Sequence, residues 1–312
     1  MLLAVAGDLL LGEPPGDFHP TVWMGRGLGA ARRAHERSST SSTQSFIAGA
    51  LTVGAGIVTT GTLAMIAELG ASILPGPART VATAALLKPT FSLRALLAAG
   101  REVEEALRNN DLDAARRALS WHLVSRDTSA LSASEVAGAA IESLSENLSD
   151  SFVAPLLWYR AGGLPAAYVY RFINTADAML GYHTLELEWF GKAAARADDV
   201  ANLVPARLTA LLIAFAAPSV GGSVQSSLRI AIRDAANTPS PNAGWPMAAM
   251  AGALDVRLDK RSTDDSTRRL YVLNSDGRAA QPDDLARAMR AVSCAAALGL
   301  ALIAAVPGGR DG

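Results

Sequence analysis

The sequence predicts an all-α fold, an integral membrane helical bundle with about five membrane-associated helices and amphipathic helical connections. Half of the 312 residues are hydrophobic and 18% are charged, against roughly 25% in soluble domains. The mean hydropathy is +0.22. Residues 46–66 contain no charged side chain, and residues 289–306 contain only Arg290. We therefore interpret residues 1–312 as a single membrane-embedded domain.

Charge and cysteine content exclude several other classes of protein. The 28 basic and 29 acidic side chains give a net charge of −1, so no nucleic-acid partner is expected. The single cysteine, Cys294, excludes a disulfide framework and a cysteine zinc site. The apolar N-terminus, residues 1–11, has Asp8 as its first charge and no basic region before it, which is unlike a secretory signal peptide.

The two strongest membrane-spanning segments are 46–66 and 289–306. A helix rises 1.5 Å per residue, so 46–66 can cross a hydrocarbon core of about 30 Å. A buried soluble helix is the alternative, although few such helices lack charge over this length. Residues 38–45 are expected to form a low-complexity linker. Three further apolar segments are shorter or interrupted, and we interpret them as bundle-facing or re-entrant: 80–99, 152–170 and 205–220.

Amphipathic helices are expected in the polar connections. Residues 101–121 are typical of two short helices, the second beginning after Asp111 as its N-cap. Ser132 and Glu135 match a capping box, in which each side chain bonds the backbone of the other residue. The helix that they begin has an apolar face between residues 136 and 148.

The other face of this helix carries a row of carboxylates. Glu142, Glu146 and Asp150 are spaced four residues apart, which places them within about 80° of arc. Like charges at this spacing repel unless a cation lies among them. Two similar groups follow in the chain, Asn174 with Asp177, and Asp198 and Asp199 with Asn202. Each group taken alone fits a solvated face or a helix cap. Three such groups beside apolar segments favour a Mg²⁺ site. The candidate magnesium ligands are Glu146, Asn147, Asp150, Asn174, Asp177, Asp198, Asp199 and Asn202.

Basic side chains near the apolar segments could hold phosphate, or could be ion-pair partners or snorkelling residues. They are Lys88, Arg94, Arg126, Arg171, Arg196 and Arg207. The sequence has no Gly-x-x-x-x-Gly-Lys-Ser/Thr loop, no His-Glu-x-x-His and no Gly-x-Ser-x-Gly. P-loop nucleotide binding, zinc-protease chemistry and serine-hydrolase chemistry are therefore not expected.

Several short motifs extend over nearly the full length of the chain. In chain order they are GDLLLGEPP (7–15), HP (19–20), WMGR (23–26), LLK (86–88), FSLR (91–94), RDT (126–128), ES (142–143), ENLSD (146–150), NTADAM (174–179), FG (190–191), DDVAN (198–202), PARLT (205–209) and PSPNAGWP (239–246). With these motifs the chain resembles the adenosylcobinamide-phosphate synthase family, the CobD/CbiB family of cobalamin biosynthesis.

The resemblance implies a multi-pass ligase of the cytoplasmic membrane that contacts lipid. Such a ligase joins a propionate carboxylate of adenosylcobyric acid, a corrinoid, to the amine of aminopropanol phosphate, with ATP and Mg²⁺ as cofactors. A carboxylate is a poor electrophile, so it must first be activated, and we interpret the activated form as an acyl phosphate. That step requires metal and positive charge around phosphoryl oxygens. A homo-oligomer is compatible with this scheme.

The resemblance also suggests roles for the remaining candidates. Lys88, Asp127, Asp8 and His19 are the catalytic candidates, with Lys88 neutralising phosphate and the other three binding the ammonium group of the amine or accepting its proton. His19 is the preferred base because the unperturbed pKa of histidine is near 6.5. The substrate-binding candidates are Arg26, Arg94, Arg126, Arg207, Ser240, Asn242 and Trp245. The last three are expected in a rigid Pro-rich loop, rather than a helix, that contacts corrinoid or nucleotide.

The chain departs from the family pattern at Pro89, Ser151, His183 and Met247, and in 256–277, where the family's glycine-rich, tyrosine-containing stretch is not found. An acid is usual at position 247, and its loss would remove a contact to the amine or the metal. Two alternatives therefore stay open. One is a sister amide ligase for a different carboxylate and amine, and the other is a non-catalytic membrane transporter or scaffold.

Overall fold

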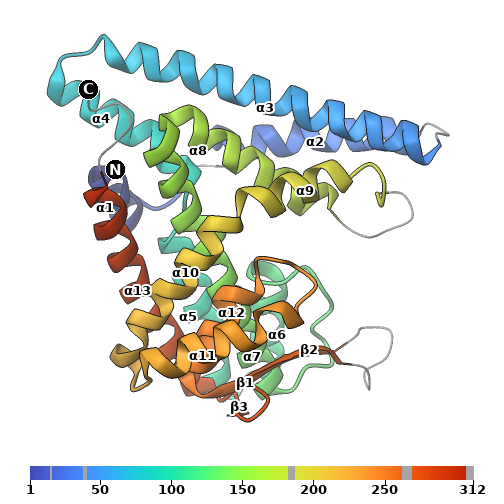
Figure 1. Cartoon of the computed structure of the whole chain (residues 1–312), viewed down its shortest axis with the longest axis vertical. Helices are drawn as coiled ribbons and strands as arrows, with labels where there is room; N and C mark the ends of the chain where they lie inside the picture. The colour runs from blue at the N-terminus through green and yellow to red at the C-terminus, as the bar shows by residue number, and fades with distance from the viewer. Residues whose placement is uncertain (15, 38–40, 182–186, 262–268, 307–312) are drawn as a thin grey trace. The chain divides into compact units, whose positions relative to one another are not determined.

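The computed structural model describes residues 1–14, 16–37, 41–181, 187–261 and 269–306 (Figure 1). The chain forms two compact units, each made of discontinuous segments. The first unit contains Met1–Ser92, Ala154–Asn202 and Ile303–Gly312, and the second contains Leu93–Val153 and Leu203–Leu302. The chain therefore passes from one unit to the other four times.

The first unit is helical throughout its described residues. Its helices are α1 (Leu2–Leu11), α2 (Pro20–Glu36), α3 (Ser42–Ser72), α4 (Gly76–Leu87), α8 (Ala154–Leu180) and α9 (Lys192–Ala201). Helix α3 packs against α8, α9 and α2. Helix α3 comes close to the segment before α9 at Gly49. This approach depends on glycine, because a Cβ at position 49 would lie 1.9 Å from the carbonyl oxygen of Phe190. Phe172, Leu180 and Phe190 form the core beneath this contact.

Helix α8 is broken near its middle. Gly162 and Gly163 have non-helical backbone angles, and Gly163 has φ of 72°, which favours glycine. The helical half that follows begins with N–H groups that have no acceptor in the preceding turn. One of them, the N–H of Leu164, donates to Oε1 of Glu68 on α3 at 3.2 Å. The apolar helix α3 thus supplies a polar cap for the second half of α8.

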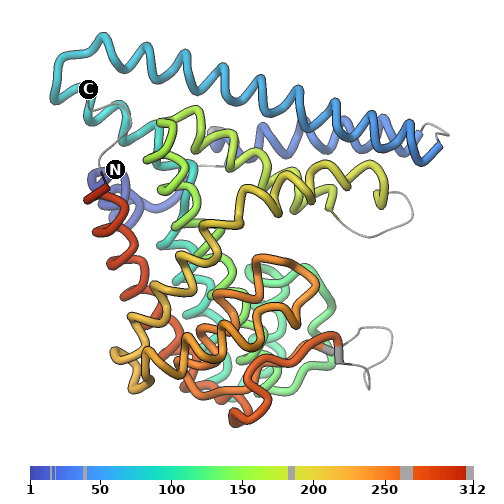
Figure 2. Tube along the Cα trace, viewed as in Figure 1, coloured from blue at the N-terminus to red at the C-terminus, as the bar shows by residue number. Residues whose placement is uncertain are grey.

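The described residues of the second unit form seven α-helices and a small sheet. The helices are α5 (Arg94–Arg108), α6 (Leu112–His122), α7 (Ala133–Leu148), α10 (Leu203–Ala216), α11 (Val224–Asp234), α12 (Gly244–Leu254) and α13 (Pro282–Ala305), whose last residues belong to the first unit. A π-helical turn, Ser149–Val153, follows α7. Helix α12 is apolar and is buried except at Trp245, and it contacts α11, α10 and α7. Figure 2 shows the course of the chain through these helices as a Cα trace in the same view.

The sheet has the order β2-β1-β3. Strand β1 (Val256–Arg261) pairs antiparallel with β2 (Arg269–Leu273) and parallel with β3 (Arg278–Ala279). The register places Lys260 opposite Tyr271. The sequence analysis did not predict this sheet, since its strands lie in a short, strongly charged segment without the regular alternation of a half-buried strand.

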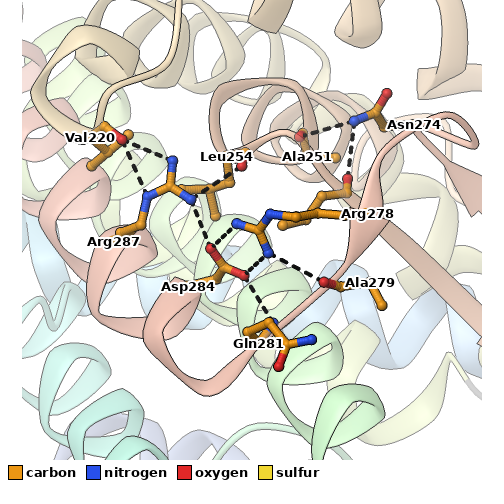
Figure 3. Close-up of polar contacts among 10 residues, drawn as sticks. Val220, Ala251, Leu254, Asn274, Arg278, Ala279, Gln281, Asp284 and Arg287 are labelled. Carbon is orange, nitrogen blue, oxygen red and sulfur yellow. Dashed lines mark hydrogen bonds and ion pairs between the residues drawn. The ribbon is translucent and has the colours of Figure 1, made fainter.

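An ion-pair network holds the end of the sheet to the beginning of α13 (Figure 3). Asp284 is 2% exposed. Its carboxylate accepts hydrogen bonds from Arg278 at 2.5 and 2.6 Å, from Arg287 at 2.7 Å and from the Gln281 N–H at 2.9 Å. Arg287 also donates to the carbonyl oxygens of Val220 and Leu254. Because the buried charge has several charge-assisted partners, it stabilises this junction.

Within the described residues, three helical segments are long and apolar enough to span a membrane: α3, residues 203–220 and α13. A fourth is obtained if Gly76–Thr90 and Arg94–Arg108 count as one broken span. The predicted spans 46–66 and 289–306 are therefore confirmed as parts of α3 and α13, and the protein is a helical membrane protein. Residues 205–220, interpreted as bundle-facing or re-entrant, are also long enough to cross. The interruption expected in 152–170 is the break in α8.

The local predictions for helix ends are largely confirmed. Asp111 caps α6 by accepting from the Ala114 N–H at 2.9 Å. The capping box of Ser132 and Glu135 has both of its hydrogen bonds. The linker expected at 38–45 is wrong in its second half, because Ser41 and Gln44 form another capping box at the first turn of α3. Residues 38–40 lie outside the described residues.

Replacing Ser132 with alanine is expected to lower the free energy of unfolding by about 1 kcal/mol, since it removes the side-chain acceptor for the Glu135 N–H. Thermal unfolding in detergent measures the effect. Ser134→Ala, in the first turn of the same helix, is the matched control, and its effect should stay below about 0.5 kcal/mol. Equal effects of the two substitutions would contradict the capping role.

Candidate functional site

Polar side chains gather at three places in the described residues, two in the first unit and one in the second. The first, the Lys88 cluster, consists of Asp8, Glu13, His19 and Lys88. Lys88 follows the last turn of α4, and Asp8 lies on α1, which packs against α4. The Lys88 ammonium lies 3.1 Å from Oδ1 of Asp8 and 2.8 Å from Oε1 of Glu13. Nε2 of His19 lies 2.9 Å from Oε2 of Glu13.

The Lys88 cluster is mostly shielded from solvent. Asp8 is fully buried, and the Lys88 side chain is 12% exposed. Burial alone would raise the pKa of Glu13, but hydrogen bonds with His19, Lys88 and Ser92 lower it to about 2. Glu13 is therefore a carboxylate at neutral pH. Sequence analysis did not select Glu13, although it lies within the GDLLLGEPP motif.

His19, the predicted base, lies at the first turn of α2. Its Nδ1 accepts a hydrogen bond from the Thr21 N–H at 3.3 Å, so that His19 caps α2. Nε2 then carries the proton and donates to Glu13. Both ring nitrogens of His19 therefore have hydrogen-bond partners in this arrangement.

The second place, the Asp198 cluster, is formed by two helical rows. Tyr170 and Asn174 are four residues apart on α8, and Asp198 and Asn202 are four residues apart at the end of α9, which packs against α8. The side-chain amide of Asn202 donates to Oδ2 of Asp198 at 3.0 Å, and that of Asn174 donates to Oδ1 at 3.4 Å. The Tyr170 hydroxyl donates to Oδ1 of Asn202 at 2.9 Å.

Burial raises the pKa of Asp198, although the hydrogen bonds from Asn202 and Asn174 act in the opposite direction. The carboxylate thus lies in a setting that disfavours its negative charge, and a cation would relieve this penalty. No group of three or more His, Cys, Asp or Glu side chains that could hold a metal occurs in the described part of the chain. One carboxylate and two amides are a donor set that Mg²⁺ can take, because this ion often uses few protein ligands and completes its shell with water and substrate phosphates. The two amides turn their N–H groups toward Asp198 in this structure, so their oxygens would have to rotate toward an ion.

Asp177 and Asp199 have separate surroundings beside this cluster. Asp199 lies 3.0 Å from Arg196, an i,i+3 pair on α9. Asp177 lies one turn after Asn174, and its carboxylate lies against Gly181, where a Cβ would come within 2.1 Å of Oδ1. The structure thus places both acids on the same two helices as the Asp198 cluster.

The third place, the Glu142 cluster, lies in the second unit and consists of Glu142, Glu146, Arg126, Lys260 and Tyr271. Glu142 is 6% exposed, and its Oε1 has no hydrogen-bond partner among the described residues. Burial raises the pKa of Glu142 to about 7, despite the positive charge of Arg126, a hydrogen bond with Tyr271 and the positive charge of Lys260. The charge of Glu146 raises it further. Burial and the same two carboxylates raise the pKa of Tyr271.

Tyr271 and Lys260 were missed at the sequence level because they lie in 256–277, the segment that departs from the family pattern. Helix α7 packs against β1, and the register of β1 and β2 sets Lys260 beside Tyr271. These two side chains therefore reach the carboxylate face of α7 only through the sheet. No helical periodicity in the sequence could have predicted this contact.

Arg207, Asn242 and Trp245, predicted separately from two motifs, lie together. Arg207 donates to Oδ1 of Asn242 at 2.7 Å and to the Pro241 carbonyl at 3.2 Å, and its guanidinium lies 5.0 Å from the Trp245 ring centroid. Ser240 accepts from the Asn242 N–H at 3.2 Å. The prediction of a loop at Trp245 is wrong, because this residue belongs to the first turn of α12.

Other predicted residues have local structural partners. Asp127 accepts hydrogen bonds from the N–H and hydroxyl of Ser129 in an exposed turn, and these bonds lower its pKa. The Asn147 amide donates to the Ser143 carbonyl one turn earlier, and Arg26 pairs with Asp17 at the surface. Arg94 is the exposed first residue of α5, and Asp150 belongs to the π-helical turn after α7.

One departure from the family pattern, Met247, is clarified by its position in the structure. Met247 is 3% exposed within α12 and belongs to the apolar core. A methionine there contributes packing, so the expected loss of a ligand at this position finds no support. His183 lies outside the described residues.

Comparison with known proteins follows this geometry. The family model for the CobD/CbiB protein matches residues 1–292. The chain belongs to this family. Its CobD/CbiB relatives include the cobalamin biosynthesis protein CobD of Geobacter metallireducens, 42% identical over 258 residues that cover 83% of this chain and 80% of the relative. The protein of the same name from Mycobacterium tuberculosis strain CDC 1551 is 39% identical over 290 residues, 93% and 89% of the two chains.

A probable cobalamin biosynthesis protein CobD of Methanocaldococcus jannaschii is 37% identical over 261 residues, which cover 83% of this chain and 85% of the relative. No solved structure matches the chain. In this CobD/CbiB family member, the clusters bring together motifs that are distant from one another in the sequence. The GDLLLGEPP motif meets LLK in the Lys88 cluster, and NTADAM meets DDVAN in the Asp198 cluster.

Proposed function

We propose that the chain catalyses ATP- and Mg²⁺-dependent amide bond formation in cobalamin biosynthesis, joining a propionate carboxylate of adenosylcobyric acid to the amine of aminopropanol phosphate. The proposal is supported by family membership over residues 1–292 and by relatives named for cobalamin biosynthesis. The observation that carries it within the structure is the half-buried carboxylate of Asp198, framed by two amides, in a helical membrane protein.

The reaction has two balanced steps. A propionate oxygen attacks the terminal phosphorus of ATP, so that an acyl phosphate forms and ADP leaves. The amine of aminopropanol phosphate then attacks the acyl carbon, phosphate leaves and the nitrogen gives up a proton. Negative charge accumulates on phosphoryl oxygens in the first step, which positively charged groups stabilise.

In this proposal Asp198, Asn174 and Asn202 hold Mg²⁺, which when bound neutralises charge on phosphate oxygens. Asp177 and Asp199 complement this group, and the acidic face of α7 is a second group of candidate ligands: Glu146, Asn147 and Asp150. Arg207, fixed by Asn242 and stacked on Trp245, presents a rigid positive charge next to an aromatic ring, which suits a phosphate or a large planar ligand.

The ion pairs of the Lys88 cluster make Lys88 less suited to neutralise a phosphate than the sequence suggested. Two carboxylates already balance its ammonium group. We therefore propose that Glu13, whose side chain is 30% exposed, rather than Lys88, is the group available to a positively charged substrate amine, which would displace Lys88 from it while Lys88 stays paired with Asp8. Arg126 remains the candidate for phosphate neutralisation in the second unit.

The decisive experiment uses detergent-purified protein with ATP, Mg²⁺, adenosylcobyric acid and aminopropanol phosphate. Mass spectrometry and nucleotide analysis should show an amidated corrinoid and ADP. Asp198→Asn should lower turnover at least about 100-fold, because the substitution removes the only carboxylate of the cluster while keeping its shape. Asp113→Asn, at an exposed position of α6, is the control and should keep wild-type turnover.

Wild-type turnover in Asp198→Asn would remove Asp198 from the site. A folded protein that binds Mg-ATP but yields no amidated corrinoid would instead support a sister ligase for another carboxylate and amine. The observation that favours this second candidate is the departure at 256–277, since Lys260 and Tyr271 of that segment enter the Glu142 cluster. Proton flux without ATP consumption would support the transporter alternative.

A further inference from the structure

The first unit contains a large cavity that the proposed chemistry does not use. Its volume is about 650 Å³, and helices α2, α3, α4 and α8 line it. We name it the α3 pocket. Along α3 its lining extends from Thr52 to Ala67, and Trp23, Leu86 and Phe172 contribute the facing walls.

The α3 pocket offers almost no hydrogen-bonding groups to a ligand. Apolar side chains and glycine make up most of the lining. Among the polar residues, Thr52 donates its hydroxyl to the Ala48 carbonyl at 2.8 Å, and Thr60 donates to that of Gly56 at 2.7 Å. The Tyr168 hydroxyl donates to the Leu86 carbonyl at 2.8 Å. Because these donors are already used, an occupant gains little from polar groups, and a hydrocarbon fits the pocket best.

The helix that forms the longest wall of the pocket is also the one most available to lipid. Helix α3 has 31 residues, and its most apolar window has a mean hydropathy of 1.7 with only 11% of its residues buried. Such a helix in a membrane is surrounded by acyl chains. The pocket and the lipid-facing surface therefore share one helix, which gives a lipid chain direct access.

We propose that the α3 pocket binds one acyl chain of a membrane phospholipid. The lining from Thr52 to Ala67 covers about 22 Å of helix at 1.5 Å per residue. One leaflet contributes about half of a 30 Å hydrocarbon core, so the pocket is long enough for a single chain. A volume of about 650 Å³ lies in the ordinary range of ligand pockets.

The pocket also adjoins the Lys88 cluster. Its lining includes Pro14, Pro20 and Pro89, which directly follow Glu13, His19 and Lys88 in the chain. An acyl chain would support these three positions from the apolar side, because it fills space that would otherwise be a void beside the cluster. The inference concerns lipid binding alone and does not depend on the proposed reaction.

The test compares two ways of adding bulk to α3. Ala55 and Thr59 line the pocket and are exposed to it, whereas Thr62 is exposed on α3 outside the lining. The pair Ala55→Phe with Thr59→Phe fills the pocket, and Thr62→Phe is the matched control. Native mass spectrometry after extensive washing in detergent counts the phospholipid retained by each chain. We expect about one phospholipid per chain in the wild type and in the control, and at least a five-fold reduction in the filled variant.

A second measurement uses Trp23, a lining residue, as a reporter. The other four tryptophans are replaced with phenylalanine, and the protein is incubated with phospholipid brominated on its acyl chain. Quenching of Trp23 fluorescence should saturate near one lipid per chain and should be lost in the filled variant. Equal lipid retention or quenching in the filled variant and the control would overturn the proposal, since it indicates lipid bound around the helices only. A retained corrinoid, or a dimer that loses its partner when the pocket is filled, would also overturn it.

Discussion

Replacing Lys88 with methionine is expected to lower the free energy of unfolding by about 3–5 kcal/mol, because the substitution leaves two carboxylates without their cation. Asp8 is fully buried, and the side chain of Glu13 is 30% exposed. Methionine keeps most of the length of the lysine stem but removes the charge, which also lies 5.9 Å from the centroid of the Phe91 ring. Denaturant unfolding of the detergent-solubilised protein measures the loss.

The matched control is Lys192→Met, which removes a lysine from an i,i+4 pair with Glu188 at the surface. An exposed pair of this kind contributes less than about 1 kcal/mol. Adding Asp8→Asn to Lys88→Met should recover part of the stability, since it removes one of the unpaired charges. Lys88→Arg, which keeps the charge, should lose less than Lys88→Met. A loss from Lys88→Met no larger than that from Lys192→Met would show that the buried pair does not stabilise the fold.

Replacing Glu142 with glutamine is expected to remove a large pH dependence of stability. Burial raises the pKa of Glu142 from 4.5 to about 7 in the folded protein. The folded state therefore holds the proton more tightly than the unfolded state, so the stability that Glu142 contributes is greatest below pH 4.5 and is lost as the pH rises to about 7. At 1.36 kcal/mol per pKa unit the loss is about 3 kcal/mol.

Unfolding curves of the wild type and Glu142→Gln between pH 4.5 and 8 test this expectation. The stability of the wild type should decline relative to that of the variant across this range, and the two should differ little in slope above pH 7. Glu105→Gln, at an exposed position of α5, should follow the wild-type profile. Parallel curves for wild type and Glu142→Gln would show that Glu142 does not titrate in this range.

The local rules of helix formation account for much of what could be predicted. The caps at Asp111 and Ser132 depend only on residues within four positions of one another, and they form as expected. The long apolar run of α3 is equally local. The π-helical turn after α7 and the glycine break within α8 were not predicted in detail, since their geometry depends on packing against other helices.

Sites that combine distant segments were predicted only in part. Asn174, Asp198 and Asn202 were selected because each lies in an i,i+3 or i,i+4 group, and the structure brings them together. Glu13, Lys260 and Tyr271 were not selected, since their partners are brought to them by tertiary contacts. His19 was selected for its chemistry, but Thr21 and Glu13 occupy both of its ring nitrogens. Side-chain type alone cannot show whether a nitrogen is free.

The cap that Glu68 provides for the second half of α8 has a consequence for biogenesis. The N–H groups exposed by the break at Gly162 and Gly163 would be costly in hydrocarbon without an acceptor. Helix α3 is synthesised first and can insert alone, as a long apolar segment that carries the acceptor near its end. The second half of the broken helix is made 96 residues after this carboxylate and then finds it in place. The second half of α8 should thus form its native contacts only once α3 is in place, because a chain without α3 leaves these N–H groups without the Glu68 acceptor.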